Sequence, residues 1–205
     1  HRSLMNKSSQ EAPSVNLLAV DTATEGCSAA CLTDDKSFER YAVDPQGHSR
    51  TLLGMVEAVL AEARLERSAL DALAYDAGPG SFTGIRIGAG VAQGLALGLE
   101  KPLLAVSSLM TLAEGARREQ PGCNSVLAAI DARMDQVYWA RLRSDPEAPG
   151  HWRWDEMPCV SEPREVAVHI SGCTGVGSGW DRYSDVFMGD RPMPWLAQRF
   201  PHALD

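Results

Sequence analysis

Residues 78–99 read GPGSFTGIRIGAGVAQGLALGL, a turn rich in glycine and proline followed by an apolar segment. Ser81 is a residue type that caps helix starts, so we predict a helix from there to about Leu99. A glycine inside a helix costs about 1 kcal/mol relative to alanine. The predicted helix contains Gly84, Gly88, Gly90, Gly94 and Gly98. Close approach of the backbone to a sheet of the same chain, or to another helix, would offset that cost.

The sequence before this stretch predicts strands and then a helix. Short apolar runs at 14–22 and 27–33 predict two strands joined by a hairpin turn, and 37–43 predicts a third strand. Residues 46–64 predict a helix, because apolar side chains recur there at i, i+3, i+4 and i+7. Residues 72–77 predict a buried strand that leads into the glycine-rich turn.

The rest of the chain predicts further strands and helices. We expect a strand at 103–106, a helix at 107–118, and strands at 125–130 and 136–143 on either side of the turn Asp131-Ala132-Arg133. Less regular patterns predict a loop at 145–150, a strand at 152–160, a short helix or strand at 163–170, a strand with a turn at 172–179, and no regular structure after Trp180.

Both halves open with an apolar strand that ends in an aspartate, Asp21 or Asp131, followed by a turn and a second strand. This repetition predicts a pseudo-duplicated α/β architecture with two lobes. We place the N-terminal lobe at 14–106 and the C-terminal lobe at 107–205. Residues 1–13 are expected to be a disordered start, with a cloning remnant before Met5.

Composition restricts the classes of function. Of the 205 residues, 44% are hydrophobic and 22% are charged, which is typical of a globular protein with its own core. A net charge of −8 argues against a protein that binds nucleic acid on its own. No run of 18 apolar residues predicts a membrane-spanning helix, and no secretory signal pattern opens the chain. Five cysteines without Cys-x-x-Cys spacing predict free thiols in a reducing cytoplasm.

Two kinds of turn carry residues that could contact phosphate. A glycine-rich approach to a helix start binds phosphate through free N–H groups, which makes Gly80 and Ser81 candidates. The stretch lacks the lysine and the spacing of known phosphate loops, so a tight turn before a closely packed helix is the competing interpretation. Asp21, Thr22 and Asp131 stand at strand ends, where an acid can hold metal-bound water or cap a turn. Alanine follows Thr22 where actin-type phosphate turns have glycine.

No pattern predicts a metal site or a nucleophilic centre. The five histidines include no His-x-x-x-His pair, and no cluster of cysteine and histidine occurs. Ser81 follows Gly-Pro-Gly and does not lie in the Gly-x-Ser-x-Gly pattern of a nucleophile elbow.

Five stretches together resemble the bacterial TsaB family, also called YeaZ. They are LLAVDTATEGCSAACL (17–32), HSRTLLGMV (48–56), GPGSFTGIRIGAGVAQGLALGL (78–99), PLLAVSSLMTLA (102–113) and AAIDARMDQVYWA (128–140). The resemblance extends over about residues 16–183. Nothing after Trp195 matches the family's usual ending, so we expect a carboxyl end that is incomplete or divergent.

The resemblance implies an actin/hexokinase-like fold, related to RNase H, with two related lobes and mixed central sheets. It also implies a cytoplasmic role in the threonylcarbamoyl modification of adenosine 37 in tRNAs that read codons beginning with A. Family members are not the transferase. They pair with TsaD, the pair recruits the ATPase TsaE, and alone they form homodimers. No cofactor is implied for this chain by itself, although ATP or ADP could bind in the complex, and tRNA is met only through the complex.

We therefore expect a non-catalytic scaffold subunit that docks on TsaD through helices of its N-terminal lobe. The expected contact residues are Leu52, Leu53, Met55, Val56, Val59, Leu60, Gly84, Gly88 and Val91. The rival hypothesis is a nucleotide-dependent phosphotransferase or ATPase that uses Asp21, Thr22, Ser81 and Asp131. A protease acting on its partner is a further alternative that the family suggests, although no catalytic set for it is evident here.

Overall fold

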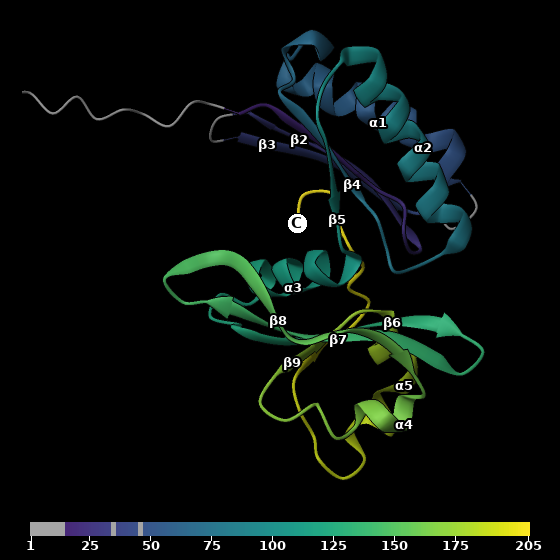
Figure 1. Ribbon diagram of the computed structural model, residues 1–205, viewed down its shortest axis with the longest axis vertical. Coiled ribbons are helices and arrows are strands. Elements are labelled where there is room, and N and C mark those ends of the chain that lie inside the picture. Colours follow the sequence, from purple (N-terminus) through teal and green to yellow (C-terminus); the bar gives the residue numbers. More distant parts are fainter. Residues whose placement is uncertain (1–14, 34–35, 45–46) are drawn as a thin grey trace, which may run out of the picture.

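The computed structural model describes residues 15–33, 36–44 and 47–205. It contains two five-stranded mixed sheets, one in each lobe, as Figure 1 shows. The expected disordered start at 1–13 lies outside the described residues.

The first sheet has the strand order β3-β2-β1-β4-β5. Its strands are β1 (Leu17–Asp21), β2 (Gly26–Thr33), β3 (Lys36–Val43), β4 (Ala72–Asp76) and β5 (Leu103–Val106). Strands β1, β2 and β3 form an antiparallel meander, whereas β4 and β5 run parallel to β1.

The second sheet, with the order β10-β9-β6-β7-β8, repeats this topology strand for strand. Its strands are β6 (Ser125–Arg133), β7 (Gln136–Asp145), β8 (Ala148–Ser161), β9 (Thr174–Val176) and β10 (Trp195–Leu196). Strands β6, β7 and β8 are antiparallel, and β9 and β10 are parallel to β6. The α/β fold of two related lobes with mixed sheets is therefore confirmed.

The helices cover the two sheets differently. They are α1 (His48–Ala63), the 3-10 turn η1 (Arg67–Ala69), α2 (Phe82–Leu99), α3 (Ser108–Glu119), α4 (Pro163–Val166) and α5 (Ser178–Met188). Helices α1 and α2 lie on one face of the first sheet, and α3 lies between the two sheets (Figure 1). The second sheet has a core on each face, because Val126, Ala128 and Ile130 pack towards α3 while Leu127 and Ala129 pack towards α4 and α5.

The regular elements follow the expected pattern, with three corrections. The turn expected at 131–133 belongs to β6, and the hairpin turns at Met134 and Asp135 instead. The loop expected at 145–150 shrinks to a turn between β7 and β8. Residues after Trp180 continue α5 and then form β10, because Trp180 and Phe187 anchor that helix in the core.

Two glycines of α2, Gly84 and Gly88, lie directly against the end of the first sheet's strand β1. A Cβ atom on Gly84 would lie 2.0 Å from the carbonyl oxygen of Thr22, and one on Gly88 would lie 2.6 Å from the Thr22 hydroxyl. These two glycines are therefore explained by close approach to β1 of the same chain. A Cβ atom on Gly90, Gly94 or Gly98 would meet no atom of a neighbouring element within 4 Å, and these three glycines face outwards.

By length and composition α2 could also cross a membrane, with a mean hydropathy of 1.2 over its 18 residues. One such helix is weak support for a membrane span, because core helices pass the same test. Only Gly84, Gly88, Ala92 and Ala96 of this helix are buried.

The two kinds of glycine in α2 should respond oppositely to alanine. Gly84→Ala places a methyl group against the β1 backbone and should lower the free energy of unfolding by about 3 kcal/mol. Gly90→Ala meets no neighbour and should raise it by about 0.5–1 kcal/mol through helix propensity. Urea denaturation followed by circular dichroism measures both. Equal effects of the two substitutions would contradict the assigned packing.

Candidate functional site

Turns from both lobes surround a cavity of about 330 Å³. Three of the five residues predicted to contact phosphate, Gly80, Ser81 and Asp131, lie on its wall. The remaining lining residues are Ala23, Thr24, Glu25, His48, Phe82, Ile130, Ala132, Arg133, Tyr138 and Ser178. Asp21 and Thr22 do not line it, so the five predicted residues do not form one cluster.

Two hydroxyl groups near this cavity form hydrogen bonds that stabilise the start of α2. The Ser81 hydroxyl accepts a hydrogen bond from the Gly84 N–H at 3.3 Å and so caps α2. The Thr22 hydroxyl is buried and donates to the Gly84 carbonyl at 2.7 Å. Thr24 differs, because its buried hydroxyl has no hydrogen-bond partner among the described residues. The turn before α2 is equally tight, since a Cβ atom on Gly80 would lie 2.1 Å from the Ala23 carbonyl oxygen.

Asp131 is held by the C-terminal lobe. Its carboxylate accepts hydrogen bonds from Arg133 at 3.2 Å and from Arg182 at 3.1 Å. Its backbone N–H donates to the hydroxyl of Ser178, at the start of α5. The nearby carboxylate raises the pKa of the Arg182 guanidinium. Arg133 also lies 3.5 Å from the Glu25 carboxylate and Arg182 lies 3.9 Å from the Asp135 carboxylate, so the two arginines are matched by acidic groups and the cavity offers little excess positive charge to an anion.

Asp21 and Asp76 form a buried carboxyl pair at the ends of β1 and β4. Each uses one oxygen locally: Asp21 accepts from the Ala23 N–H at 2.9 Å, and Asp76 accepts from the Gly78 N–H at 2.7 Å and from the Ser108 hydroxyl at 2.5 Å. The other oxygen of each is buried without a hydrogen-bond partner among the described residues, and the two groups lie close enough for the charge of Asp76 to raise the pKa of Asp21. Two carboxyls this close favour a state in which one of them carries a proton.

Burial, together with the charge and the hydrogen bond of Asp76, raises the pKa of Asp21 well above its usual value. Burial also raises the pKa of Asp76, although its hydrogen bonds from Asp21, Ser108 and Gly78 lower it in part. Asp21 is therefore the member that keeps the proton. A protonated, hydrogen-bonded Asp21 stabilises the junction of two strands and does not offer a carboxylate to a metal-bound water.

Six of the nine expected partner contacts lie inside the N-terminal lobe rather than on its surface. Leu52, Val56, Val59 and Leu60 are buried in the core between α1 and the first sheet, because they form the stripe that faces β2. Gly84 and Gly88 face Thr22 of the same chain. Met55 and Val91 are half-buried and pack against this core, whereas Leu53 is 51% exposed.

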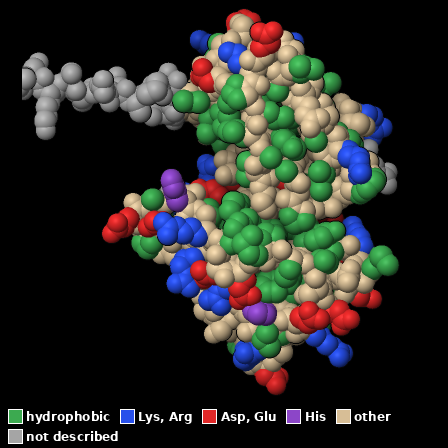
Figure 2. All heavy atoms as spheres, viewed as in Figure 1, with side chains coloured by type: hydrophobic (Ala, Val, Ile, Leu, Met, Phe, Trp, Pro, Cys, Tyr) green, Lys and Arg blue, Asp and Glu red, His purple; other side chains and the backbone are tan. Residues whose placement is uncertain are grey.

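The outer side of α2 nevertheless carries exposed apolar and glycine residues, whereas the outer side of α1 is mixed, with Leu53 and Gly54 beside exposed Arg50 and Glu57. Leu97 is 82% exposed, and Leu53 and the outward glycines of α2 accompany it. Figure 2 shows apolar side chains spread over this lobe, with charged side chains at its upper end and along its right edge. We call Leu53, Gly54, Gly90, Gly94, Leu97 and Gly98 the helix face. A sequence pattern alone could not separate it from the core stripe, because α1 is apolar on more than one side.

Two further features bear on chemistry. Within the described ranges, no three His, Cys, Asp or Glu side chains are grouped so that they could hold a metal ion. Asp76 is the member of the buried carboxyl pair that the sequence interpretation missed. It could have been found, because ALAYD at 72–76 ends an apolar strand in aspartate as LLAVD does at 17–21.

The fold and the cavity between its lobes define a two-lobed α/β protein in which each lobe has a five-stranded mixed sheet of the same topology. Residues 43–148 match the family model described as TsaD, tRNA N6-adenosine threonylcarbamoyltransferase. The tRNA threonylcarbamoyladenosine biosynthesis protein TsaB of Escherichia coli is 44% identical over 176 residues, which cover 84% of this chain and 75% of that protein. The protein of the same name from Haemophilus influenzae is 38% identical, over 83% of this chain and 75% of that protein.

Solved structures agree with this relationship. YeaZ from Pseudomonas aeruginosa matches with a TM-score of 0.84 at 45% identity, over 92% of this chain and 87% of that one. A second Pseudomonas aeruginosa structure, described as an uncharacterized protein with similarity to peptidase YEAZ, matches with a TM-score of 0.83 at 44% identity, over the same shares of the two chains. The chain belongs to the TsaB family.

The carboxyl pair should make the stability of the protein depend on pH. A carboxyl with a raised pKa in the folded state favours folding at low pH, and that contribution is lost as pH rises through the folded-state pKa. Asp21→Asn supplies a neutral group that can still donate to Asp76. It should raise the free energy of unfolding by about 1–3 kcal/mol at pH 8 and change it little at pH 4.

Chemical denaturation at pH 4, 6 and 8 measures this effect. Asp185→Asn, a substitution of an exposed aspartate on α5, is the matched control and should leave the pH profile of the native chain unchanged. A loss of stability in Asp21→Asn that is equal at all three pH values would contradict the shared proton.

Proposed function

We propose that this protein is a non-catalytic subunit of tRNA threonylcarbamoyladenosine biosynthesis, and that it activates a TsaD transferase by docking on it. In this proposal the modified base is adenosine 37 of tRNAs that read codons beginning with A. The similarity to TsaB proteins supports the pathway, and the TsaD family model supports descent of this chain and its partner from one ancestor. TsaE joins the pair, and the chain alone forms a homodimer in the cytoplasm.

The observation that carries the docking proposal is the exposed apolar side of α2. Of its 18 residues only four are buried, and its exposed side consists largely of glycine and apolar side chains. An exposed apolar patch of this kind marks an interaction surface in a monomer. Outward glycines also remove the side chains that would hold a second helix at a distance, which is how close helix packing is achieved.

The polar side chains that could act in catalysis already make structural contacts, which supports a non-catalytic role. Ser81 caps α2, two arginines neutralise Asp131, and Asp21 is buried beside Asp76. A phosphotransferase, an ATPase or a peptidase would need a free nucleophile or base at this cavity. His48 also lines the cavity, but its Nε2 faces the Glu25 carbonyl oxygen at 3.5 Å. The buried Thr24 hydroxyl has no hydrogen-bond partner among the described residues, so these two groups are not paired as nucleophile and base.

Charges on the helix face should abolish pairing and leave the lobe folded. Leu53→Glu with Leu97→Glu places two carboxylates at exposed positions, so we expect near-native thermal stability. Binding to TsaD, measured by co-purification and calorimetry, should weaken by at least about 100-fold, because both charges would be desolvated in the complex.

Val168→Glu is the control for this experiment, because Val168 is an exposed apolar residue of the other lobe. It should leave pairing intact. Undiminished pairing of the doubly charged variant would refute docking through the helix face. Val56→Glu is unsuitable as a test, since Val56 is buried and a charge there would unfold the lobe.

The enzyme hypothesis has its own test. The purified chain without TsaD should release no phosphate from ATP above the background of the buffer. ATP turnover that disappears in Asp131→Ala would establish the phosphotransferase or ATPase and overturn the proposed role.

A further inference from the structure

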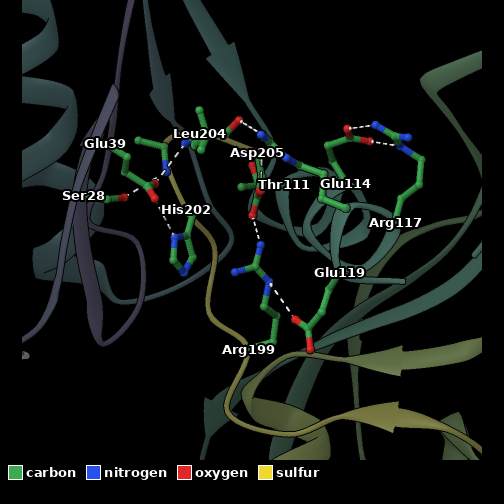
Figure 3. Close-up of polar contacts among 12 residues, drawn as sticks. Ser28, Glu39, Thr111, Glu114, Arg117, Glu119, Arg199, His202, Leu204 and Asp205 are labelled. Carbon is green, nitrogen blue, oxygen red and sulfur yellow. Dashed lines mark hydrogen bonds and ion pairs between the residues drawn. The ribbon is translucent and has the colours of Figure 1, made fainter. Parts of the chain in front are cut away.

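The last residues of the chain cross from the second lobe back to the first. Residues 199–205, which we call the strap, pass α3 and end against the face of the first sheet that α1 and α2 do not cover (Figures 1 and 3). The Ala203 N–H donates to the Ser28 hydroxyl at 2.9 Å, and the Leu204 N–H donates to a Glu39 carboxylate oxygen at 3.3 Å. These two hydrogen bonds hold the strap to β2 and β3.

A cavity of about 150 Å³ lies between the strap and the first sheet. Apolar side chains from four strands and from the strap form much of its wall, namely Leu17, Ala19, Leu32, Ala74, Val106 and Leu204. Three carboxyl groups also line it, those of Asp21, Asp76 and Asp205. The cavity therefore joins an apolar wall to a group of acidic side chains.

The carboxyl group of Asp205 has basic partners within the chain. Arg199 pairs with it (Figure 3), and the Arg118 guanidinium lies 3.8 Å from it. Although this side chain is only 4% exposed, its negative charge is compensated.

The carboxyl pair of Asp21 and Asp76 has no such compensation. The Oδ2 atom of each is buried and accepts no hydrogen bond from the described residues. The two residues are only 2% and 5% exposed, so bulk water does not satisfy these oxygens. No basic side chain is among the groups that shift the pKa of either carboxyl.

A proton carried by the pair itself is thus the only donor that the described residues supply to these two oxygens. Buried polar groups normally have hydrogen-bond partners, because an unpartnered one costs free energy. Two unpartnered acceptors on the wall of one cavity therefore indicate a ligand that brings donors and positive charge.

We propose that this cavity binds a small primary alkylammonium ion, which donates N–H groups to the free oxygens of Asp21 and Asp76 and lays its carbon chain on the apolar wall. An ammonium group carries three donors around one positive charge, so it can satisfy both carboxyl groups at once. A metal ion suits the site less, because no three His, Cys, Asp or Glu side chains in the described part of the chain are grouped to hold one. This ligand belongs to the chain by itself and does not depend on docking to TsaD.

The size of the cavity limits the length of the amine. A volume of about 150 Å³ equals the share of about five water molecules in the liquid, which corresponds to an ammonium group with about four carbon atoms. A second cavity of about 260 Å³ shares Val106, Thr111 and Asp205 with the first. Because Val106 is 37% exposed, this second cavity provides a route from the surface.

The ammonium ion takes the place of the proton that the pair carries. Burial and the charges of Asp76 and Asp205 raise the pKa of Asp21, so one carboxyl of the pair is protonated before the amine binds. Binding releases that proton to solvent, and the net charge of the site does not change. The titratable and charged groups that face the site come from the strands, α3 and the strap: Asp21, Glu39, Tyr75, Asp76, Arg118, Arg199, His202 and Asp205.

Isothermal titration calorimetry of the full chain with n-butylammonium chloride tests the proposal. At pH 6 we expect a dissociation constant of about 1 mM or lower. The same titration in phosphate and in MES, whose ionisation enthalpies differ, should show release of about 0.5–1 proton per bound amine. Tetramethylammonium has the same charge but no N–H group, so it should not bind, and magnesium chloride should not displace butylammonium.

Asp21→Asn removes the charge and the proton that the site exchanges. It should weaken butylammonium binding by at least about tenfold and abolish proton release. Asp190→Asn, at an exposed aspartate before β10, is the matched control and should bind as the native chain does.

Three results would overturn the proposal: no binding of millimolar butylammonium to the native chain, equal binding of tetramethylammonium, or unchanged affinity in a folded Asp21→Asn variant. If that variant does not fold, the comparison of the two ammonium ions and the proton count on the native chain still decide. None of these measurements involves TsaD, so their outcome is independent of the docking experiment.

Discussion

Glycines of α2 pack directly against Thr22, the residue that follows β1, and this contact positions the helix on the first sheet. The end of β1 leaves no space for side chains at Gly80, Gly84 or Gly88. The helix is therefore fixed by its small residues, and the Thr22 hydroxyl ties the two elements together. Only the side of α2 formed by Gly84, Gly88, Ala92 and Ala96 is buried, so the rest of the helix, which is largely apolar, faces outwards. The helix face is a geometric consequence of how the helix is attached.

The second lobe repeats this arrangement in the same place. Gly177 and Gly179 lie against Ala129 of β6 as the glycines before and within α2 lie against β1, and a Cβ atom on Gly177 would be 2.3 Å from the Ala129 carbonyl oxygen. Ser178 then joins the start of α5 to Asp131 through a hydrogen bond. The duplication therefore includes the packing of a helix start on a strand end as well as the order of strands.

Local sequence patterns predicted most of the elements, because period-two and helical spacing are properties of neighbouring residues. The sequence was a poorer guide to which side chains of a helix face the sheet and which face solvent. Leu52 and Leu53 are adjacent and equally apolar, yet only the structure shows that the first faces the sheet and the second faces solvent. The carboxyl pair could be predicted only from the fact that β1 and β4 are neighbours in the sheet. The contact between His202 and Glu39 joins residues 163 positions apart in the sequence. No window of sequence contains either relationship.

Ser108 begins α3 immediately after the chain leaves the first sheet, and its hydroxyl is bonded to Asp76 while its N–H is bonded to the Gly78 carbonyl. The connection between the lobes is thus anchored at the carboxyl pair itself. Gain or loss of a proton at Asp76 therefore alters a hydrogen bond made by the residue at which the chain enters the second lobe.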